Sequence, residues 1–182
     1  MHFYGKGNLE YKISINLYSN YEKEGEFTLV CYNFEDKPLV KLTFGFLNNS
    51  IIIGGLQGLE KGENPNLIKE ATKSMYGIFP KKIVLEVLYL LFPEYEIIGV
   101  GRDKHIYFSD HYRKKKEGKV YANYDEFWES IDGIEKDGMW ILPTKLERKK
   151  LEEIPSKKRS LYQNRFSLLD SIFEDISLKI NN

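Results

Sequence analysis

The 182-residue chain carries 27 Lys and Arg residues against 27 Asp and Glu residues, so its formal net charge is zero at pH 7. This length fits one domain with a substantial hydrophobic core. The balanced charge argues against a nucleic-acid-binding protein, which normally has an excess of basic residues. The single cysteine, Cys31, excludes an intramolecular disulfide and a cysteine-cluster metal site, and its apolar neighbours predict a buried, unreactive thiol.

The N-terminal residues lack the charged start and apolar core of a secretory signal. The most apolar run, residues 83–92, is about half as long as a membrane span and contains Glu86. We therefore expect a cytoplasmic protein without a transmembrane segment.

The first 55 residues predict an antiparallel meander. Apolar and polar residues alternate in residues 11–18 and 39–47, which is typical of half-buried strands, and residues 26–33 form a further strand between two polar turns. Residues 50–54 are apolar on both faces, which predicts a central position in the sheet.

Helices follow the meander. Asn64 and Pro65 are typical of a helix start, and a second helix is predicted over residues 81–92. Residues 95–101 return as a strand, so that strand, helices and strand form a right-handed crossover with a parallel pair.

The last part of the chain is a polar segment followed by helices. A short strand is predicted over residues 119–121, a short helix over 124–131, a last strand over 138–142, and helices over 145–153 and 156–180. The final helix carries an apolar stripe of Tyr162, Phe166, Leu169, Phe173, Ile176 and Ile180. The predicted fold class is α+β or α/β, a single domain with a mixed, largely antiparallel sheet, helices packed on it and a long C-terminal helix.

A glycine-rich stretch, Gly54-Gly55-Leu56-Gln57-Gly58, is predicted as a loop after the central strand. It matches neither the nucleotide-binding P-loop nor the dinucleotide-binding glycine pattern. Its glycines would allow close approach of a ligand phosphate to the backbone, or would simply let the strand turn. Under the first alternative, the cofactor-binding candidates are Gly54, Gly55, Gln57 and Gly58.

The segment after the predicted parallel strand contains His105, Tyr107 and His111, which are the candidate catalytic residues. Ligands bind at the carboxyl ends of parallel strands, where acid–base groups would be useful. The alternative is that both histidines lie on the surface of a polar hairpin. Their spacing matches no compact metal-ligand pattern, so no metal site is predicted.

Arg159, Tyr162 and Arg165 recur every three residues along one side of the last helix. Two guanidinium groups close together can clamp a carboxylate or a phosphate, so these residues and Arg102 are the substrate-binding candidates. Alternatively, the arginines are solvated or paired with acids.

Six stretches in order along the chain resemble the VirK/YbjX family of bacterial proteins: GGLQG (54–58), KSMYGIFPK (73–81), IIGVGRDKHIY (97–107), YDEFW (124–128), MWILP (139–143) and IPSKKRSLYQNRF (154–166). This resemblance implies a domain of unknown biochemical function, linked in enterobacteria to virulence and to resistance against cationic antimicrobial peptides. It implies no catalytic residues.

The order of elements also resembles acyl-CoA-dependent N-acyltransferases of the GNAT type. In that comparison, residues 51–54 are the central strand, 54–58 the pyrophosphate-binding loop and 96–101 the splayed parallel strand. The sequence departs from the GNAT pattern because several residues separate Gly58 from the helix start at Pro65. The resemblance implies acyl-CoA or another acyl carrier as cofactor, with His105 or Tyr107 as the acid–base group.

Two other hypotheses stay open. A non-enzymatic binding or stress-response module would use the same cleft for a small-molecule or peptide ligand. A scaffold for a protein partner, whose identity the sequence does not give, would expose an apolar patch, for example on the last helix.

Overall fold

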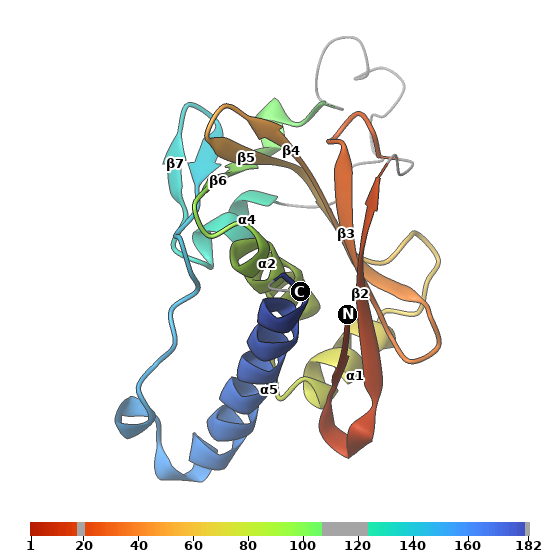
Figure 1. Cartoon of the computed structure of the whole chain (residues 1–182), viewed down its shortest axis with the longest axis vertical. Coiled ribbons are helices and arrows are strands. Elements are labelled where there is room, and N and C mark those ends of the chain that lie inside the picture. The colour runs from red at the N-terminus through yellow and green to blue at the C-terminus, as the bar shows by residue number, and fades with distance from the viewer. Residues whose placement is uncertain (18–20, 107–123, 181–182) are drawn as a thin grey trace.

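The computed structural model describes residues 1–17, 21–106 and 124–180, which form one open eight-stranded sheet with helices packed on it (Figure 1). The strands lie in the order β1-β2-β3-β4-β5-β6-β8-β7. Their bounds are β1 (His2–Tyr4), β2 (Glu10–Leu17), β3 (Phe27–Tyr32), β4 (Pro38–Leu47), β5 (Ser50–Gln57), β6 (Glu96–Val100), β7 (Ile134–Lys136) and β8 (Met139–Ile141). The α-helices are α1 (Asn66–Ser74), α2 (Pro80–Leu91), α4 (Tyr124–Glu129) and α5 (Ser156–Ile180).

The predicted mixed, largely antiparallel sheet is confirmed. Strands β1 to β5 pair antiparallel in chain order, and β6 returns parallel to β5 after the helical crossover through α1 and α2. Strand β8 then pairs antiparallel with β6, and β7 pairs with β8. The crossover has the helical content that a parallel connection requires.

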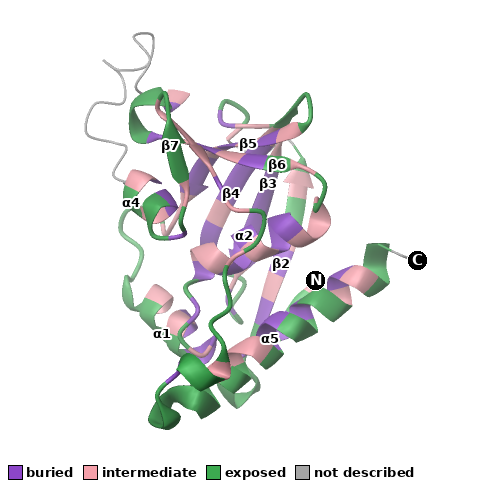
Figure 2. Ribbon diagram, turned by 90° about the vertical axis from the view of Figure 1, so that its left-hand side faces the viewer, coloured by how far each residue is buried: buried purple, intermediate pink, exposed green. Residues whose placement is uncertain are grey.

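The core lies between the sheet and α2, which packs on β3 and β4. Figure 2 shows the buried residues gathered in the sheet and beneath this helix. Phe44, Ile51 and Ile53 from the sheet and Leu85 and Leu88 from α2 are at most 1% exposed. Burial of such apolar side chains supplies most of the favourable free energy of folding.

Helix α5 packs on α2 and β1. Its buried residues are Leu168, Leu169, Ile172 and Ile176. The stripe predicted for this helix is therefore only partly right, because Phe173 is 52% exposed and Ile180 is 57% exposed. At about 100° per residue, the four buried residues occupy an arc bounded by Leu168 and Leu169, and Phe173 lies about 40° beyond the Leu169 edge of that arc.

The predicted loop at Gly54–Gly58 is wrong for most of its length, because β5 continues to Gln57. Beyond Ile53, β5 pairs only with β4, through Thr43 with Gly55 and Lys41 with Gln57. The register shifts between Thr43 and Phe44, so that Gly54 is the extra residue of a β-bulge. The apolar pattern does not reveal where this strand ends, because two of its last four residues are glycines.

Two strands were missed, one predicted helix needs correction, and one predicted strand lies outside the described residues. Strands β1 and β7 were not predicted, because three residues are too few to show an alternating pattern. The helix predicted over 145–153 is reduced to a 3₁₀ turn at Leu151–Glu153. Leu146 packs against the core, while the charged residues around it give no helical stripe. The strand predicted over 119–121 lies outside the described residues.

Candidate functional site

The glycines of β5 lie against Glu24, a residue of the turn between β2 and β3. A Cβ atom on Gly54 would stand 1.9 Å from the backbone oxygen of Glu24, and one on Gly55 would stand 1.8 Å from its carboxylate oxygen Oε2. Gln57 donates from Nε2 to both carboxylate oxygens, at 2.8 and 3.0 Å. The Glu24 side chain, which is fully buried, therefore fills the space that a ligand phosphate would need at these glycines.

His105 reaches the same cluster from the turn Arg102–Lys104 that follows β6. Its Nε2 lies 3.8 Å from Glu24 Oε1, which is beyond hydrogen-bond range, and its ring lies 5.3 Å from that of Tyr124 at the start of α4. Burial lowers the pKa of His105 to about 4, so the imidazole is neutral at pH 7. The side chain is 1% exposed, which separates it from solvent in this structure.

Asp125 and Trp128 of α4 hold the end of β6 in place. Asp125 Oδ1 accepts hydrogen bonds from the backbone N–H of Arg102 at 3.0 Å and from Trp140 Nε1 at 2.9 Å. Trp128 donates to the carbonyl of Val100 at 3.1 Å, and its indole covers Gly99, where a Cβ would stand 2.6 Å from the ring. Asp125 and Trp128 belong to the YDEFW stretch. Their contacts therefore position the segment of chain that leads to His105.

Of the three candidate catalytic residues, one lies in the described part of the chain. Tyr107 and His111 lie outside the described residues, and His105 is buried as given above. Arg102, a substrate-binding candidate, is exposed in the turn after β6 and contributes its backbone N–H to Asp125. It does not line the cleft described next.

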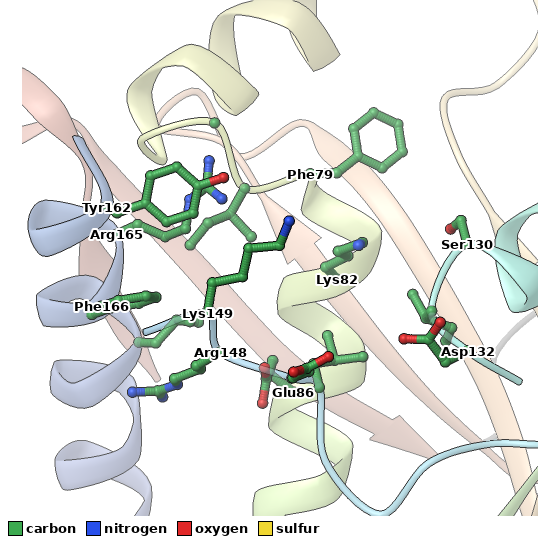
Figure 3. Close-up of a pocket in the computed structure, with 16 residues that line it drawn as sticks. Phe79, Lys82, Glu86, Ser130, Asp132, Arg148, Lys149, Tyr162, Arg165 and Phe166 are labelled. Carbon is green, nitrogen blue, oxygen red and sulfur yellow. The ribbon is translucent and has the colours of Figure 1, made fainter. Parts of the chain in front are cut away.

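A cleft of about 380 Å³ lies between α2, α5 and the chain that joins β8 to α5 (Figure 3). Its aromatic wall includes Phe79, Tyr162 and Phe166. Its basic residues are Lys82, Arg148, Lys149 and Arg165, and its acidic residues are Glu86, Asp132 and Glu147. This volume suits a small ligand.

Two of the predicted substrate-binding residues, Tyr162 and Arg165, line this cleft, whereas Arg159 does not. Arg165 donates from Nε and Nη2 to the carbonyl of Tyr76, at 3.1 and 3.0 Å, and its guanidinium lies 4.3 Å from the Tyr162 ring centroid. Arg159 donates from Nε to the carbonyl of Ile154 at 3.0 Å. The two guanidinium groups hold separate backbone segments, so they do not form the predicted clamp.

Sequence reasoning missed the other charged residues of the cleft. Lys82 and Glu86 share one side of α2, while Arg148 and Lys149 come from the extended chain before α5. Desolvation raises the pKa of the Glu86 carboxyl, against a smaller opposing effect of Arg148 and Lys82. The i, i+4 spacing of Lys82 and Glu86 could have indicated a shared helix face, but no local pattern joins them to Lys149.

The described part of the chain holds no cluster of metal-ligating side chains and no membrane-spanning helix. Residues 1–17, 21–106 and 124–180 contain no group of three or more His, Cys, Asp or Glu that could hold a metal ion. Over the same ranges, no helix combines the length and the apolar character needed to cross a membrane.

Comparisons with known proteins agree with the predicted family. The chain is 38% identical over 177 residues to the uncharacterized protein YbjX of Escherichia coli, a match covering 92% of this chain and 53% of the relative. It is 32% identical over 172 residues to an uncharacterized protein of Haemophilus influenzae, covering 93% of this chain and 57% of the relative. The chain thus spans about half the length of these curated relatives. No solved structure gives a significant match.

A family model described as a protein of unknown function, DUF535, matches residues 1–177. This match covers every described element except the last turn of α5. The chain therefore belongs to the DUF535 family, together with the YbjX protein it resembles.

Proposed function

We propose that this domain binds a small ligand with an acidic group, a carboxylate or a phosphate, in the cleft between α2 and α5. The observation that carries the proposal is the position of Lys82 and Lys149. Both line the cleft, and neither has a carboxylate within 4.0 Å among the described residues. Figure 3 shows the Lys149 side chain reaching toward Tyr162 and the Lys82 amino group to its right, over α2.

The surroundings of these lysines favour an anion. The other two basic groups of the cleft are already engaged, Arg148 with Asp170 at 2.5 Å and Arg165 with the carbonyl of Tyr76. Lys82 is half-buried on α2, so the surrounding protein partly shields its charge from water. An incoming carboxylate or phosphate would therefore find two ammonium donors close to an aromatic wall.

Acyl transfer at β5 has less support than ligand binding in this cleft. The strand order agrees with the expected crossover, but Glu24 fills the space at Gly54 and Gly55, and its carboxylate would repel a phosphate. Acyl-CoA is still a member of the proposed ligand class, because its phosphates would suit the lysine pair. A peptide ligand also belongs to the class through its terminal carboxylate.

Ligand binding is tested by thermal melting and calorimetry with three probes: pyrophosphate, acetyl-CoA and N-acetyldialanine. A ligand present at a hundred times its Kd stabilises the native state by about 2.7 kcal/mol, which raises Tm by several degrees. We expect at least one probe to do so, and we expect the Lys82→Ala/Lys149→Ala variant to lose the effect.

The matched control is Lys61→Ala/Lys158→Ala, which removes two exposed lysines that do not line the cleft. This variant should bind as the wild type does. Absence of a shift with all three probes would refute the proposal, and so would an equal loss of binding in the control.

A further inference from the structure

We infer that the ligand of this cleft is a zwitterion, a small molecule with both an amino group and an acidic group, such as a short peptide with free ends. This inference rests on the proposed function, because it assumes that Lys82 and Lys149 bind the acidic group. It adds that Glu86 and Asp132 bind the amino group. The structural basis is that lysines and carboxylates line one cleft without forming ion pairs with each other among the described residues.

The acidic residues of the cleft have no cationic partner within ion-pair distance among the described residues. Among the described residues, no Lys, Arg or His nitrogen lies within 4.0 Å of a Glu86, Asp132 or Glu147 carboxylate oxygen. Glu86 is half-buried, and burial of a charge without a partner is unfavourable. An ammonium group of a ligand would relieve that cost by pairing with Glu86.

Lys82 and Glu86 are four residues apart on α2, a spacing at which opposite charges can form an ion pair. They are not within ion-pair distance of each other. Figure 3 shows the Lys82 and Lys149 amino groups in the upper part of the view, with Glu86 below them and Asp132 at the right. Both charges therefore remain available to a ligand that spans one turn of the helix.

The spacing of the two residues on the helix suggests a length for the first probe. Four residues of α-helix advance about 6 Å along the axis, which is the rise between the α-carbons of Lys82 and Glu86. The two charged ends of a fully extended dipeptide are about 7 Å apart. A dipeptide is thus a suitable first probe, and its apolar side chains would face Phe79 and Phe166.

The test compares dialanine, N-acetyldialanine, dialanine amide and N-acetyldialanine amide by isothermal titration calorimetry on the full chain. We expect dialanine to bind at least about tenfold more tightly than either singly blocked form, since each block removes one charge-assisted contact. The Glu86→Gln variant should bind dialanine and N-acetyldialanine with similar affinity. The Lys149→Ala variant should instead lose the preference for the free carboxylate.

A matched control is Glu129→Gln, which removes an exposed carboxylate of α4 that does not line the cleft and should leave both preferences intact. If N-acetyldialanine binds as tightly as dialanine, the ligand is recognised by its acid group only, and the inference fails while the proposed function stands. An unchanged amine preference in Glu86→Gln also overturns the inference. If no dipeptide form binds, and pyrophosphate and acetyl-CoA do not bind either, both proposals fail together.

Discussion

The carboxylate of Glu24 lies so close to Gly55 that a Cβ atom on this glycine would stand 1.8 Å from Oε2. Glu24 belongs to the turn before β3, whereas Gly55 follows the bulge of β5. The missing side chains of Gly54 and Gly55 therefore make room for this turn on the sheet. Gln57 completes the contact by donating two hydrogen bonds to the buried carboxylate.

The first prediction is that Gly55→Ala lowers the free energy of unfolding by about 2–3 kcal/mol, because the new methyl group overlaps a buried, hydrogen-bonded carboxylate. The matched control is Gly58→Ala, whose Cβ would meet no atom within 4 Å. It should change stability by no more than about 0.5 kcal/mol. Urea denaturation of both variants measures the difference in the free energy of unfolding. Equal values would show that the Glu24 side chain moves aside without loss of stability.

A second prediction concerns pH. The pKa of His105 is about 4 in the folded chain and near 6.5 when exposed, so the unfolded state binds this proton first as the pH falls. The stabilising contribution is complete above pH 6.5 and is lost between pH 6.5 and 4. Its full size is about 3 kcal/mol, since each pKa unit corresponds to roughly 1.4 kcal/mol.

Denaturant titrations at a series of pH values test this prediction. The His105→Gln variant should show a smaller loss of stability over the same interval than the wild type. The comparison is His2→Gln, which alters an exposed histidine and should lose more stability over this interval than His105→Gln does. Identical slopes for wild type and His105→Gln would contradict the assignment.

A third prediction addresses Asp125, which accepts hydrogen bonds from the Arg102 backbone and the Trp140 indole. Asp125→Ala should lower the free energy of unfolding by about 2–3 kcal/mol, because two donors lose one acceptor. Asp125→Asn retains an amide oxygen at this position and should cost less. The comparison is Glu126→Ala at the next, exposed position, and chemical denaturation should rank it closest to the wild type.

Arg165→Lys is the fourth prediction. The guanidinium donates twice to the carbonyl of Tyr76, a residue with a positive φ of 53°. A lysine ammonium cannot reproduce this planar pair of bonds, so the substitution should cost about 1–2 kcal/mol of stability. Lys158→Arg, a basic exchange at an exposed position of the same helix, should be neutral. Thermal melting distinguishes the two, and equal Tm values would contradict a structural role for the guanidinium.

The fifth prediction is that Cys31 does not react in the native state. The thiol is completely buried, and burial raises its pKa to about 12. Iodoacetamide should label it only after unfolding, because the reactive thiolate is both inaccessible and scarce at neutral pH. Mass spectrometry with increasing urea would follow the reaction. Labelling of the folded chain at the denatured rate would show that β3 opens readily.

Local patterns in the sequence predicted much of the fold. Alternating apolar residues placed β2 and β4, and Asn64 and Pro65 marked the start of the helical crossover that makes β6 parallel to β5. These features depend on neighbouring residues, so they can be recognised without knowledge of distant contacts. The same patterns failed for the segment 145–150, where tertiary contacts of Leu146 hold an extended chain.

The site residues show the limit of such patterns. The glycines of β5 resembled a phosphate-binding loop, because nothing near them in the chain indicates that Glu24 lies against them. Likewise, Lys82 and Lys149 face one cleft only because α2 and the chain before α5 are brought together by the packing of two helices.

The sequence by itself determined the family and the order of most strands and helices, since both follow from residues close together in the chain. The tertiary structure decided which charges are buried and which line a shared cleft. These properties arise from contacts between residues far apart in sequence, whose side-chain positions depend on the packing of the whole domain.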